Sequence, residues 1–344
     1  MKKKLLVFID ALPYDHKFLF DKYISNWNLD LSPLKPSYGY SSNQHNLLLR
    51  GLSPDAADFF TDYTIISKNK FSYYLKHTNW FTYIFRKIQS RLGVNRANIP
   101  LGMGHMFKQV GIYPLSSKIK LDSLTNDFHH WDFYADKDAS EKLKSLSISR
   151  NTILVFNHID HLGHYKGVDS NEYKSSVEKL FDQIHKYLEK NNVELLLFSD
   201  HGMSCKPKKV KLILEETFGK QSNSGYKYFI DSTTLKVWVK DNILKTKIMH
   251  YLNDRVEGSI LDEKERKAHG LTNNDFGDII FVLGNDYYFE PQYFGFGIKS
   301  KTLGMHGNSP HDRGQWGVWA GDHQLGKCND ARYFFKDILT KFIK

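Results

Sequence analysis

Three stretches of the chain are apolar at nearly every position for five or six residues, and each is followed by acidic or histidine residues. They cover residues 5–9, 152–156 and 193–198. A run without regular polar alternation predicts a strand that is buried on both faces, as in a parallel sheet. Between the last two runs, residues 171–191 carry apolar side chains at helical spacing, and Ser170 is a suitable N-cap. Strand, helix and strand in this order predict a parallel βαβ unit.

The pattern elsewhere in the chain extends this α/β prediction. It predicts strands over residues 227–230, 235–239 and 279–283, helices over 242–253 and 330–342, and the return of the core sheet near 316–319. We therefore expect one catalytic α/β domain over residues 1–344, with a mostly parallel central sheet flanked by helices. Two stretches do not fit this core, and we expect them to be inserted cap regions: approximately 55–150 and 206–300.

The first predicted cap is rich in aromatic and basic side chains, above all in residues 71–91. We interpret this run as the packed core of the cap with a solvated basic face, because its aromatic residues occupy more than one side of a helix. A surface that binds a nucleobase, a sugar or a membrane lipid is the alternative.

The charge balance favours anionic partners. Lys and Arg number 48 against 38 Asp and Glu, which gives a formal net charge of +10, and on charge alone a small phosphorylated substrate, nucleic acid and an acidic membrane surface are all open as partners. No nucleic-acid-binding motif is visible. Asp10 interrupts the first apolar run too early for a signal peptide, and no window approaches the roughly 20 apolar residues of a membrane span. With only two cysteines, a cytoplasmic protein is expected.

Acidic and histidine side chains gather where the three predicted strands end. Asp10 follows the first strand, Asp160 follows the second, and Asp200 and His201 follow the third. The carboxyl ends of parallel strands lie at one edge of a sheet, so these side chains are expected to converge. Asp160 and His164 are predicted to flank a tight turn at Gly163.

A late His306-Gly307 pair supplies a further imidazole. Mixed carboxylate and imidazole ligation suits zinc or manganese better than calcium or a thiolate zinc site. The sequence therefore predicts a metal site built from these residues.

Residues 39–51 have the pattern of a loop that leads into a short helix, which ends at Gly51. Ser41 is expected at the start of this helix, where free N–H groups and the helix dipole stabilise an alkoxide and a phosphate. An ordinary N-cap role for Ser41 or Ser42 is the alternative.

These motifs, in this order, resemble the alkaline phosphatase superfamily, and within it the nucleotide pyrophosphatase/phosphodiesterase branch. The resemblance spans most of the chain outside the predicted insertions. The matching positions are Asp10, Ser41, the Gly-Leu-Ser-Pro turn at 51–54, Asp160 with His164, Asp200-His201-Gly202-Met203 and His306-Gly307.

The resemblance implies an enzyme with two divalent metal ions, with zinc expected and manganese as the alternative. One ion would be held by Asp160, His164 and His306. The other would be held by Asp10, Ser41, Asp200 and His201. Ser41 would be the nucleophile and would form a phospho-serine intermediate.

One position departs from the family pattern. The family has a phosphate-binding Asn three residues after its nucleophile, where this chain has Gln44, with Asn43 one place earlier. Asn43 is therefore the predicted substrate-binding residue, and Gln44 is the alternative.

The expected function is that of a metal-dependent phosphoric ester hydrolase, in particular a phosphodiesterase or nucleotide pyrophosphatase. A sulfatase is rejected, since Ser41 lacks the Pro and Arg that follow a sulfatase nucleophile. Two alternatives stay open: a phosphotransferase or mutase that passes the phosphoryl group to an alcohol, and a non-catalytic protein that binds anions or nucleic acid.

Overall fold

The chain divides into two units, and each is assembled from segments that are far apart in the sequence. The computed structural model describes residues 2–39, 41–61, 128–133, 139, 141, 143, 146, 150–219, 225–230, 232–290 and 302–344. The first unit, here called the sheet unit, comprises Met1–Ser53, Lys118–Pro207 and Thr302–Lys344. The second, called the inserted unit, comprises Pro54–Ser117 and Lys208–Lys301. The aromatic and basic run at 71–91 lies outside the described residues.

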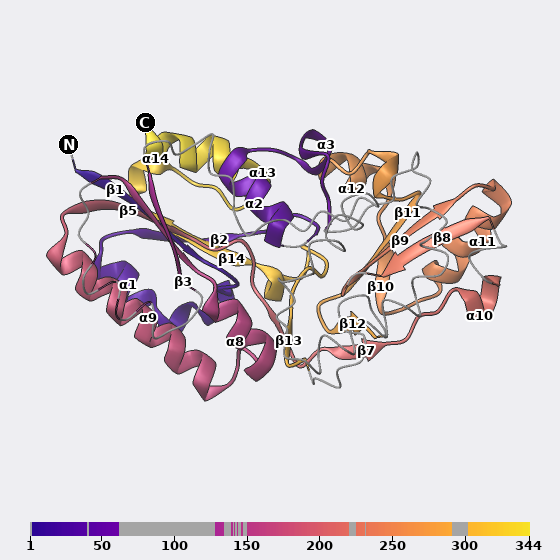
Figure 1. Ribbon diagram of the computed structural model, residues 1–344, viewed down its shortest axis with the longest axis horizontal. Helices are drawn as coiled ribbons and strands as arrows, with labels where there is room; N and C mark the ends of the chain where they lie inside the picture. Colours follow the sequence, from indigo (N-terminus) through magenta and orange to yellow (C-terminus); the bar gives the residue numbers. More distant parts are fainter. Residues whose placement is uncertain are drawn as a thin grey trace, which may run out of the picture. The chain divides into compact units, whose positions relative to one another are not determined.

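A six-stranded sheet forms the centre of the sheet unit, in the order β2-β14-β5-β1-β4-β3. Its strands are β1 (Lys3–Ile9), β2 (Asp30–Leu34), β3 (His129–Phe133), β4 (Thr152–Phe156), β5 (Val193–Phe198) and β14 (Gly317–Gly321). Strands β5, β1, β4 and β3 are parallel, whereas β14 is antiparallel to both of its neighbours (Figure 1). The predicted α/β class with a mostly parallel sheet is confirmed.

The continuous apolar runs arise because helices cover both faces of this sheet. Along β1, Leu5 and Val7 pack into one core cluster, while Leu6 and Phe8 pack into another on the opposite face. Both clusters are almost free of solvent-exposed side chains, so neither face of the strand needs polar residues. The predicted βαβ unit is present, with β1 inserted between β4 and β5.

Figure 1 shows the helical layers on the two sides of the sheet, with α1 and α9 on one side and α2 and α13 on the other. The helical segments of this unit are η1 (Tyr14–Leu19), α1 (Asp21–Asn26), α2 (Ser41–Arg50), α8 (His158–Lys166), α9 (Asn171–Lys190), η4 (Arg313–Gln315), η5 (His323–Leu325), α13 (Ala331–Phe334), η6 (Phe335–Leu339) and α14 (Thr340–Ile343). The predicted cap of α9 is present, since the Ser170 side chain accepts a hydrogen bond from the Tyr173 N–H.

The predicted turn at Gly163 is wrong, because residues 158–166 form the helix α8. Gly163 serves close packing instead of a bend. A Cβ at this position would lie 2.6 Å from the Met203 sulfur, which is closer than van der Waals contact allows. The helix places Asp160 and His164 four residues apart and therefore on one face.

The inserted unit contains a four-stranded antiparallel sheet in the order β10-β11-β9-β8 and a parallel pair, β12-β7. Its elements are α3 (Pro54–Ala57), β7 (Lys208–Val210), α10 (Glu215–Phe218), β8 (Tyr226–Ile230), β9 (Thr234–Val239), α11 (Asn242–Asn253), β10 (Gly258–Ile260), α12 (Glu263–Ala268), η3 (Asn274–Phe276), β11 (Ile279–Leu283) and β12 (Tyr287–Phe289). The three predicted strands and the predicted helix at 242–253 are all present here.

The structure differs from the expected insertion at one place. The stretch 55–150 was predicted to be a cap, but β3 lies within it and pairs with β4 at the edge of the central sheet. Its sequence, His-His-Trp-Asp-Phe, has no continuous apolar run, because an edge strand is less completely buried than a central one. A cap role for the remaining insertions stays a prediction.

The described residues contain no helix that is long and apolar enough to cross a membrane. The cytoplasmic location stays a prediction.

Candidate active site

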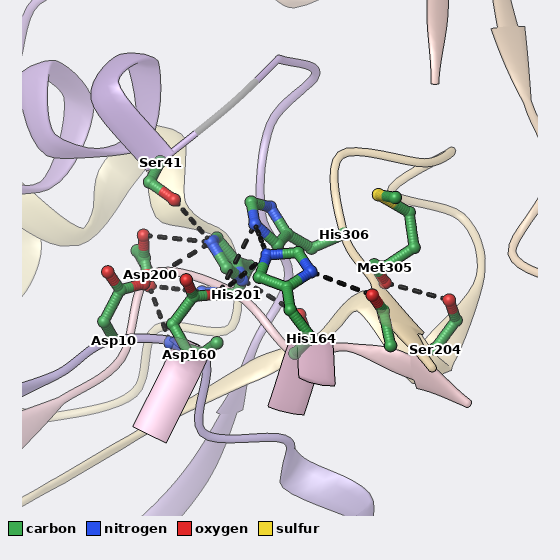
Figure 2. A network of polar contacts seen from close by, with 12 residues as sticks. Asp10, Ser41, Asp160, His164, Asp200, His201, Ser204, Met305 and His306 are labelled. Atoms are coloured by element: carbon green, nitrogen blue, oxygen red, sulfur yellow. Dashed lines mark hydrogen bonds and ion pairs between the residues drawn. The ribbon is translucent and has the colours of Figure 1, made fainter. Parts of the chain in front are cut away.

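The predicted metal-ligating residues all belong to the sheet unit, at the carboxyl end of its parallel strands. Asp10 follows β1, and Asp200 and His201 follow β5. Asp160 and His164 lie on α8, which begins two residues after β4. His306 follows β13 (Gly304–Met305), which pairs with β6 (Ser204–Cys205). Figure 2 shows these side chains pointing toward one another.

Asp160, His164 and His306 form one compact group, here called the Asp160 cluster. The Nε2 atoms of His164 and His306 are 3.1 Å apart. The Asp160 Oδ1 atom lies 3.3 Å from His164 Nε2 and 3.4 Å from His306 Nε2. The three ligand atoms thus form a nearly equilateral triangle.

The size of this triangle fits a single metal ion. Zinc–nitrogen and zinc–oxygen bonds of about 2.0–2.1 Å in a tetrahedral site place two ligand atoms about 3.3 Å apart. The three measured edges lie close to this value. The cluster therefore has the donors and the spacing to hold one divalent cation.

Asp10, Ser41, Asp200 and His201 form the second group, here called the Asp200 cluster. The His201 Nε2 atom is its centre: it lies 2.7 Å from Ser41 Oγ, 3.3 Å from Asp200 Oδ2 and 3.7 Å from Asp10 Oδ1. Asp200 is completely buried and His201 is 3% exposed. The two clusters adjoin, because the rings of His201 and His306 stack with centroids 4.0 Å apart.

Backbone carbonyl groups fix the orientation of two of the imidazoles. The Nδ1 atom of His164 lies 2.8 Å from the Gly304 carbonyl oxygen, and that of His201 lies 2.9 Å from the Gly202 carbonyl oxygen. A carbonyl oxygen only accepts hydrogen bonds, so in each ring Nδ1 carries a proton, and Nε2 is the nitrogen that offers a lone pair when the ring is neutral. Metal-ligating histidines are usually held in this way.

In the absence of a cation, burial disfavours the ionised form of the carboxyl groups in the site and the protonated form of its imidazoles. Burial, and then the charges of Asp200 and Asp160, raise the pKa of Asp10 well above its ordinary value. Burial, and then the neighbouring His201, lower the pKa of His306 well below its ordinary value. The neutral imidazole that results is the form that binds metals.

The other two carboxyl groups are affected in the opposite direction. Burial acts to raise the pKa of Asp160, but the neighbouring His164 and His306 outweigh it and lower the pKa. Burial is likewise outweighed at Asp200, whose pKa is lowered chiefly by His201 and then by His45. Two of the three carboxyl groups are therefore held in the ionised form.

The unsatisfied polar atoms also fit a metal site. Within the part of the chain that the structure describes, Asp10 Oδ1, Asp160 Oδ1 and Asp200 Oδ2 are buried and receive no hydrogen bond. Buried carboxylate oxygens without a donor are unfavourable unless a cation compensates them. All three atoms point into the two clusters, so a cation in each would satisfy them.

Ser41 is the first residue of α2, as predicted. The helix ends at Gly51, which has a positive φ of 65° and suits a C-terminal cap. The first N–H groups of a helix have no intrahelical partner and attract anions. Ser41 Oγ is thus placed beside His201 and at a position that favours a bound phosphate.

The predicted substrate-binding amides turn toward the loop before Ser41. Asn43 is fully buried and donates from Nδ2 to the Tyr38 carbonyl oxygen at 2.7 Å. Gln44 accepts from the Ser37 N–H and donates to the Ser37 carbonyl oxygen. Both side chains therefore fix the loop that leads to the nucleophile, and contact of Asn43 with phosphate stays a prediction.

His45 is a contact of the site that the sequence reasoning left unassigned. Its Nε2 atom lies 3.5 Å from Asp200 Oδ2. Its position four residues after Ser41 is the sequence signal that could have identified it, because residues at that spacing share one helix face. Two further histidines without an assigned role are His158, whose ring contacts Phe156, and His311, which contacts Lys35 and Tyr38.

Comparison with protein families gives one match. The family described as "Type I phosphodiesterase / nucleotide pyrophosphatase" matches residues 78–307, which is more than half of the chain. The match includes Asp160, His164, Asp200, His201 and His306. No curated protein sequence matches the chain.

Solved structures similar to this chain include two of ectonucleotide pyrophosphatase/phosphodiesterase 5. The murine protein, an inactive variant in complex with AMP, has a TM-score of 0.65 and 14% sequence identity, and the match covers 100% of this chain and 95% of that one. The human protein has a TM-score of 0.62 and 12% identity, with 99% and 95% covered. At these identities the similarity establishes the fold.

Proposed function

Because the chain belongs to the type I phosphodiesterase/nucleotide pyrophosphatase family, within the alkaline phosphatase superfamily, we propose that it is a metal-dependent hydrolase of phosphoric diesters with Ser41 as its nucleophile. The family supports the hydrolase class, and the geometry around Ser41 supports the mechanism. The observation that carries the proposal is the 2.7 Å contact of Ser41 Oγ with His201 Nε2 beside two carboxylates.

The two clusters are proposed to bind one divalent cation each, zinc or manganese. The ligands are Asp160, His164 and His306 in the Asp160 cluster, and Asp10, Ser41, Asp200 and His201 in the Asp200 cluster. When bound, such cations lower the pKa of a coordinated hydroxyl and neutralise charge on phosphoryl oxygens.

The residues of the chain then define the reaction. Ser41 Oγ forms a bond to phosphorus while the bond from phosphorus to the leaving oxygen breaks. The N–H groups at the start of α2 stabilise the negative oxygens of the phosphoryl group. Water attacks the resulting phospho-serine and restores Ser41, and the phosphate monoester leaves. Asn43 holds the loop before the nucleophile, and phosphate contact is proposed for it as well.

A nucleotide is the proposed substrate class. The support is the AMP bound to the murine structural neighbour together with the family description. The proposed reaction requires a phosphoryl group at the two clusters and a leaving group on the side of phosphorus opposite Ser41. A nucleotide diester has both.

Hydrolysis of a chromogenic phosphodiester by the purified protein tests the proposal, with added zinc or manganese and with a chelator. We expect turnover that depends on the metal, and a nucleotide diester as a better substrate than the corresponding monoester. A second assay adds an alcohol and identifies the products. Product esters of that alcohol would indicate a phosphotransferase, and a protein that binds two metal equivalents without turnover would indicate a binding role.

A further inference from the structure

The Asp200 carboxylate has two oxygen atoms in different environments. Oδ1 accepts hydrogen bonds from the N–H groups of Ala11, at 3.3 Å, and His201, at 3.0 Å. Oδ2 lies 3.3 Å from His201 Nε2 and 3.5 Å from His45 Nε2. Since the residue is completely buried, a hydrogen bond to Oδ2 has to come from one of these two rings, from the Asp10 carboxyl group when it carries a proton, or from a group bound in the site.

The tautomer of His201 excludes it as the donor. Its Nδ1 atom, 2.9 Å from the Gly202 carbonyl oxygen, carries the proton. When His201 binds a cation, Nε2 is the ring nitrogen that uses its lone pair for this purpose, and it then cannot donate to Asp200. Asp10 binds a cation only as the ionised carboxylate, which has no proton to donate, so the imidazole of His45 is the remaining side-chain donor near Oδ2.

The position of the His45 ring is set by packing. The ring stands edge-on to Phe8, with centroids 5.1 Å apart and an interplanar angle of 85°. Phe8 is a buried residue of β1. Within the described residues, His45 Nε2 and Asp200 Oδ2 are both buried without a hydrogen-bond partner, and they lie 3.5 Å apart. The ring is thus directed at Asp200 by an apolar contact on one side.

We propose that His45 is a positioning residue for the Asp200 cluster: its Nε2 atom, 3.5 Å from Asp200 Oδ2 in this structure, comes within hydrogen-bonding distance when a cation is bound, donates to that oxygen and fixes the carboxylate orientation in which the other lone pair faces the cation. This inference rests on the proposed function. A carboxylate oxygen has two lone pairs, so one hydrogen bond leaves one pair for a metal. Partners of this kind commonly change metal affinity by tenfold to a hundredfold.

The placement also connects the nucleophile to the ligand. Ser41 and His45 are four residues apart on α2, so they lie on the same face of one rigid helix. A shift of this helix would move Ser41 Oγ away from His201 and His45 away from Asp200 together. The contact therefore holds the start of α2 in register with the end of β5.

Two substitutions of His45 distinguish this role from simple packing. In His45→Gln the amide nitrogen takes the place of Nε2, whereas in His45→Asn it takes the place of Nδ1 and cannot reach Asp200. Both variants lose the same ring and the same contact with Phe8. His185→Asn, at a half-buried histidine that accepts a hydrogen bond from Trp27, is the control for loss of a histidine elsewhere in the unit.

The measurement is the zinc affinity of each of the two binding equivalents, by competition with a chromophoric chelator. We expect His45→Asn to weaken one equivalent about tenfold to a hundredfold, and His45→Gln to stay within a few-fold of the wild type. Equal affinities in all variants, or equal losses in both His45 variants, would overturn the assignment. A wild-type protein that binds no metal would overturn the proposed function, and the His45 role with it.

Discussion

Asp10 is a proposed metal ligand whose pKa is raised by its surroundings. Burial, followed by the charges of Asp200 and Asp160, raises its pKa. In the metal-free protein the carboxyl group therefore keeps its proton to a higher pH than an exposed Asp does. The pKa of His306 is lowered. Its imidazole therefore stays neutral, and a proton does not compete with a cation for this ring as it does for the Asp10 carboxylate. Below this raised pKa, a cation that binds at Asp10 has to displace a proton.

Metal affinity is therefore expected to rise with pH up to the raised pKa of Asp10 and to level off above it. The sign follows because a protonated carboxyl group is not a ligand and each binding event then releases a proton. Zinc titration calorimetry in buffers with different ionisation enthalpies measures the released protons. In Asp10→Asn the affinity should be lower and the pH slope smaller. An unchanged slope in this variant would show that another group supplies the proton.

Ser41→Ala separates the chemistry from metal binding. Removal of the hydroxyl should reduce turnover by several orders of magnitude, because no phospho-serine can form. Metal binding should largely survive, since six of the seven proposed ligands remain. The assay is single-turnover hydrolysis of a chromogenic diester, with metal content measured on the same samples. Ser42→Ala, at the next position of α2, is the control, and activity that survives in Ser41→Ala but not in Ser42→Ala would move the nucleophile to Ser42.

At the scale of the elements, the sequence predicted the strands and the helix whose apolar pattern follows directly from burial. The runs that became β1, β4 and β5 are apolar because both of their faces are covered, and this pattern is visible without a structure. The helix α9 was predicted for the same reason, from its apolar stripe and its Ser170 cap. Asp10, Asp160 and Asp200 could be placed near one another because each follows one of these strands.

The elements that were missed depend on contacts that a local pattern does not contain. The edge strand β3 has too few apolar positions, and β6 and β13 are only two residues long. The helix α8 was predicted to be a turn, because Gly163 suggests a bend until its contact with Met203 is known. His45 was left unassigned, since its contact with Asp200 joins residues that are far apart in the sequence.

The close approach of α8 to β13 makes a prediction for Gly304. A Cβ at this residue would lie 2.5 Å from the Gly163 carbonyl oxygen and 2.5 Å from the Met203 sulfur. Gly304→Ala should therefore push α8 away and lengthen the hydrogen bond from His164 Nδ1 to the Gly304 carbonyl. Overpacking of this kind costs about 1–3 kcal/mol of stability.

The expected result for Gly304→Ala is a lower unfolding midpoint together with weaker binding of one of the two metal equivalents. Chemical denaturation of the metal-free protein and zinc competition measure the two effects. Gly225→Ala is a control, since a Cβ there would meet nothing within 4 Å, although its φ of 71° adds backbone strain without touching the site. If Gly304→Ala loses stability and keeps both zinc affinities, the position of α8 does not limit the Asp160 cluster.

For the whole molecule, the net charge of +10 and the cations proposed for the two clusters act in the same direction on an anionic substrate. The charged residues belong to both units, so most of them act on the substrate from a distance. Salt screens such long-range interactions, with a Debye length of about 10 Å at about 0.1 M ionic strength. The proposed attack of Ser41 takes place among buried and half-buried side chains, where salt has less access. Association and chemistry should therefore respond differently to ionic strength.

We expect kcat/KM for an anionic phosphodiester to fall several-fold when the ionic strength rises from about 0.02 to about 0.5 M, while kcat changes little. A zwitterionic diester with the same leaving group is the matched substrate, since its zero net charge removes the long-range attraction. Its kcat/KM should depend only weakly on salt. Equal salt dependence for both substrates would mean that salt acts on the enzyme itself and that the positive charge of the chain does not steer the substrate.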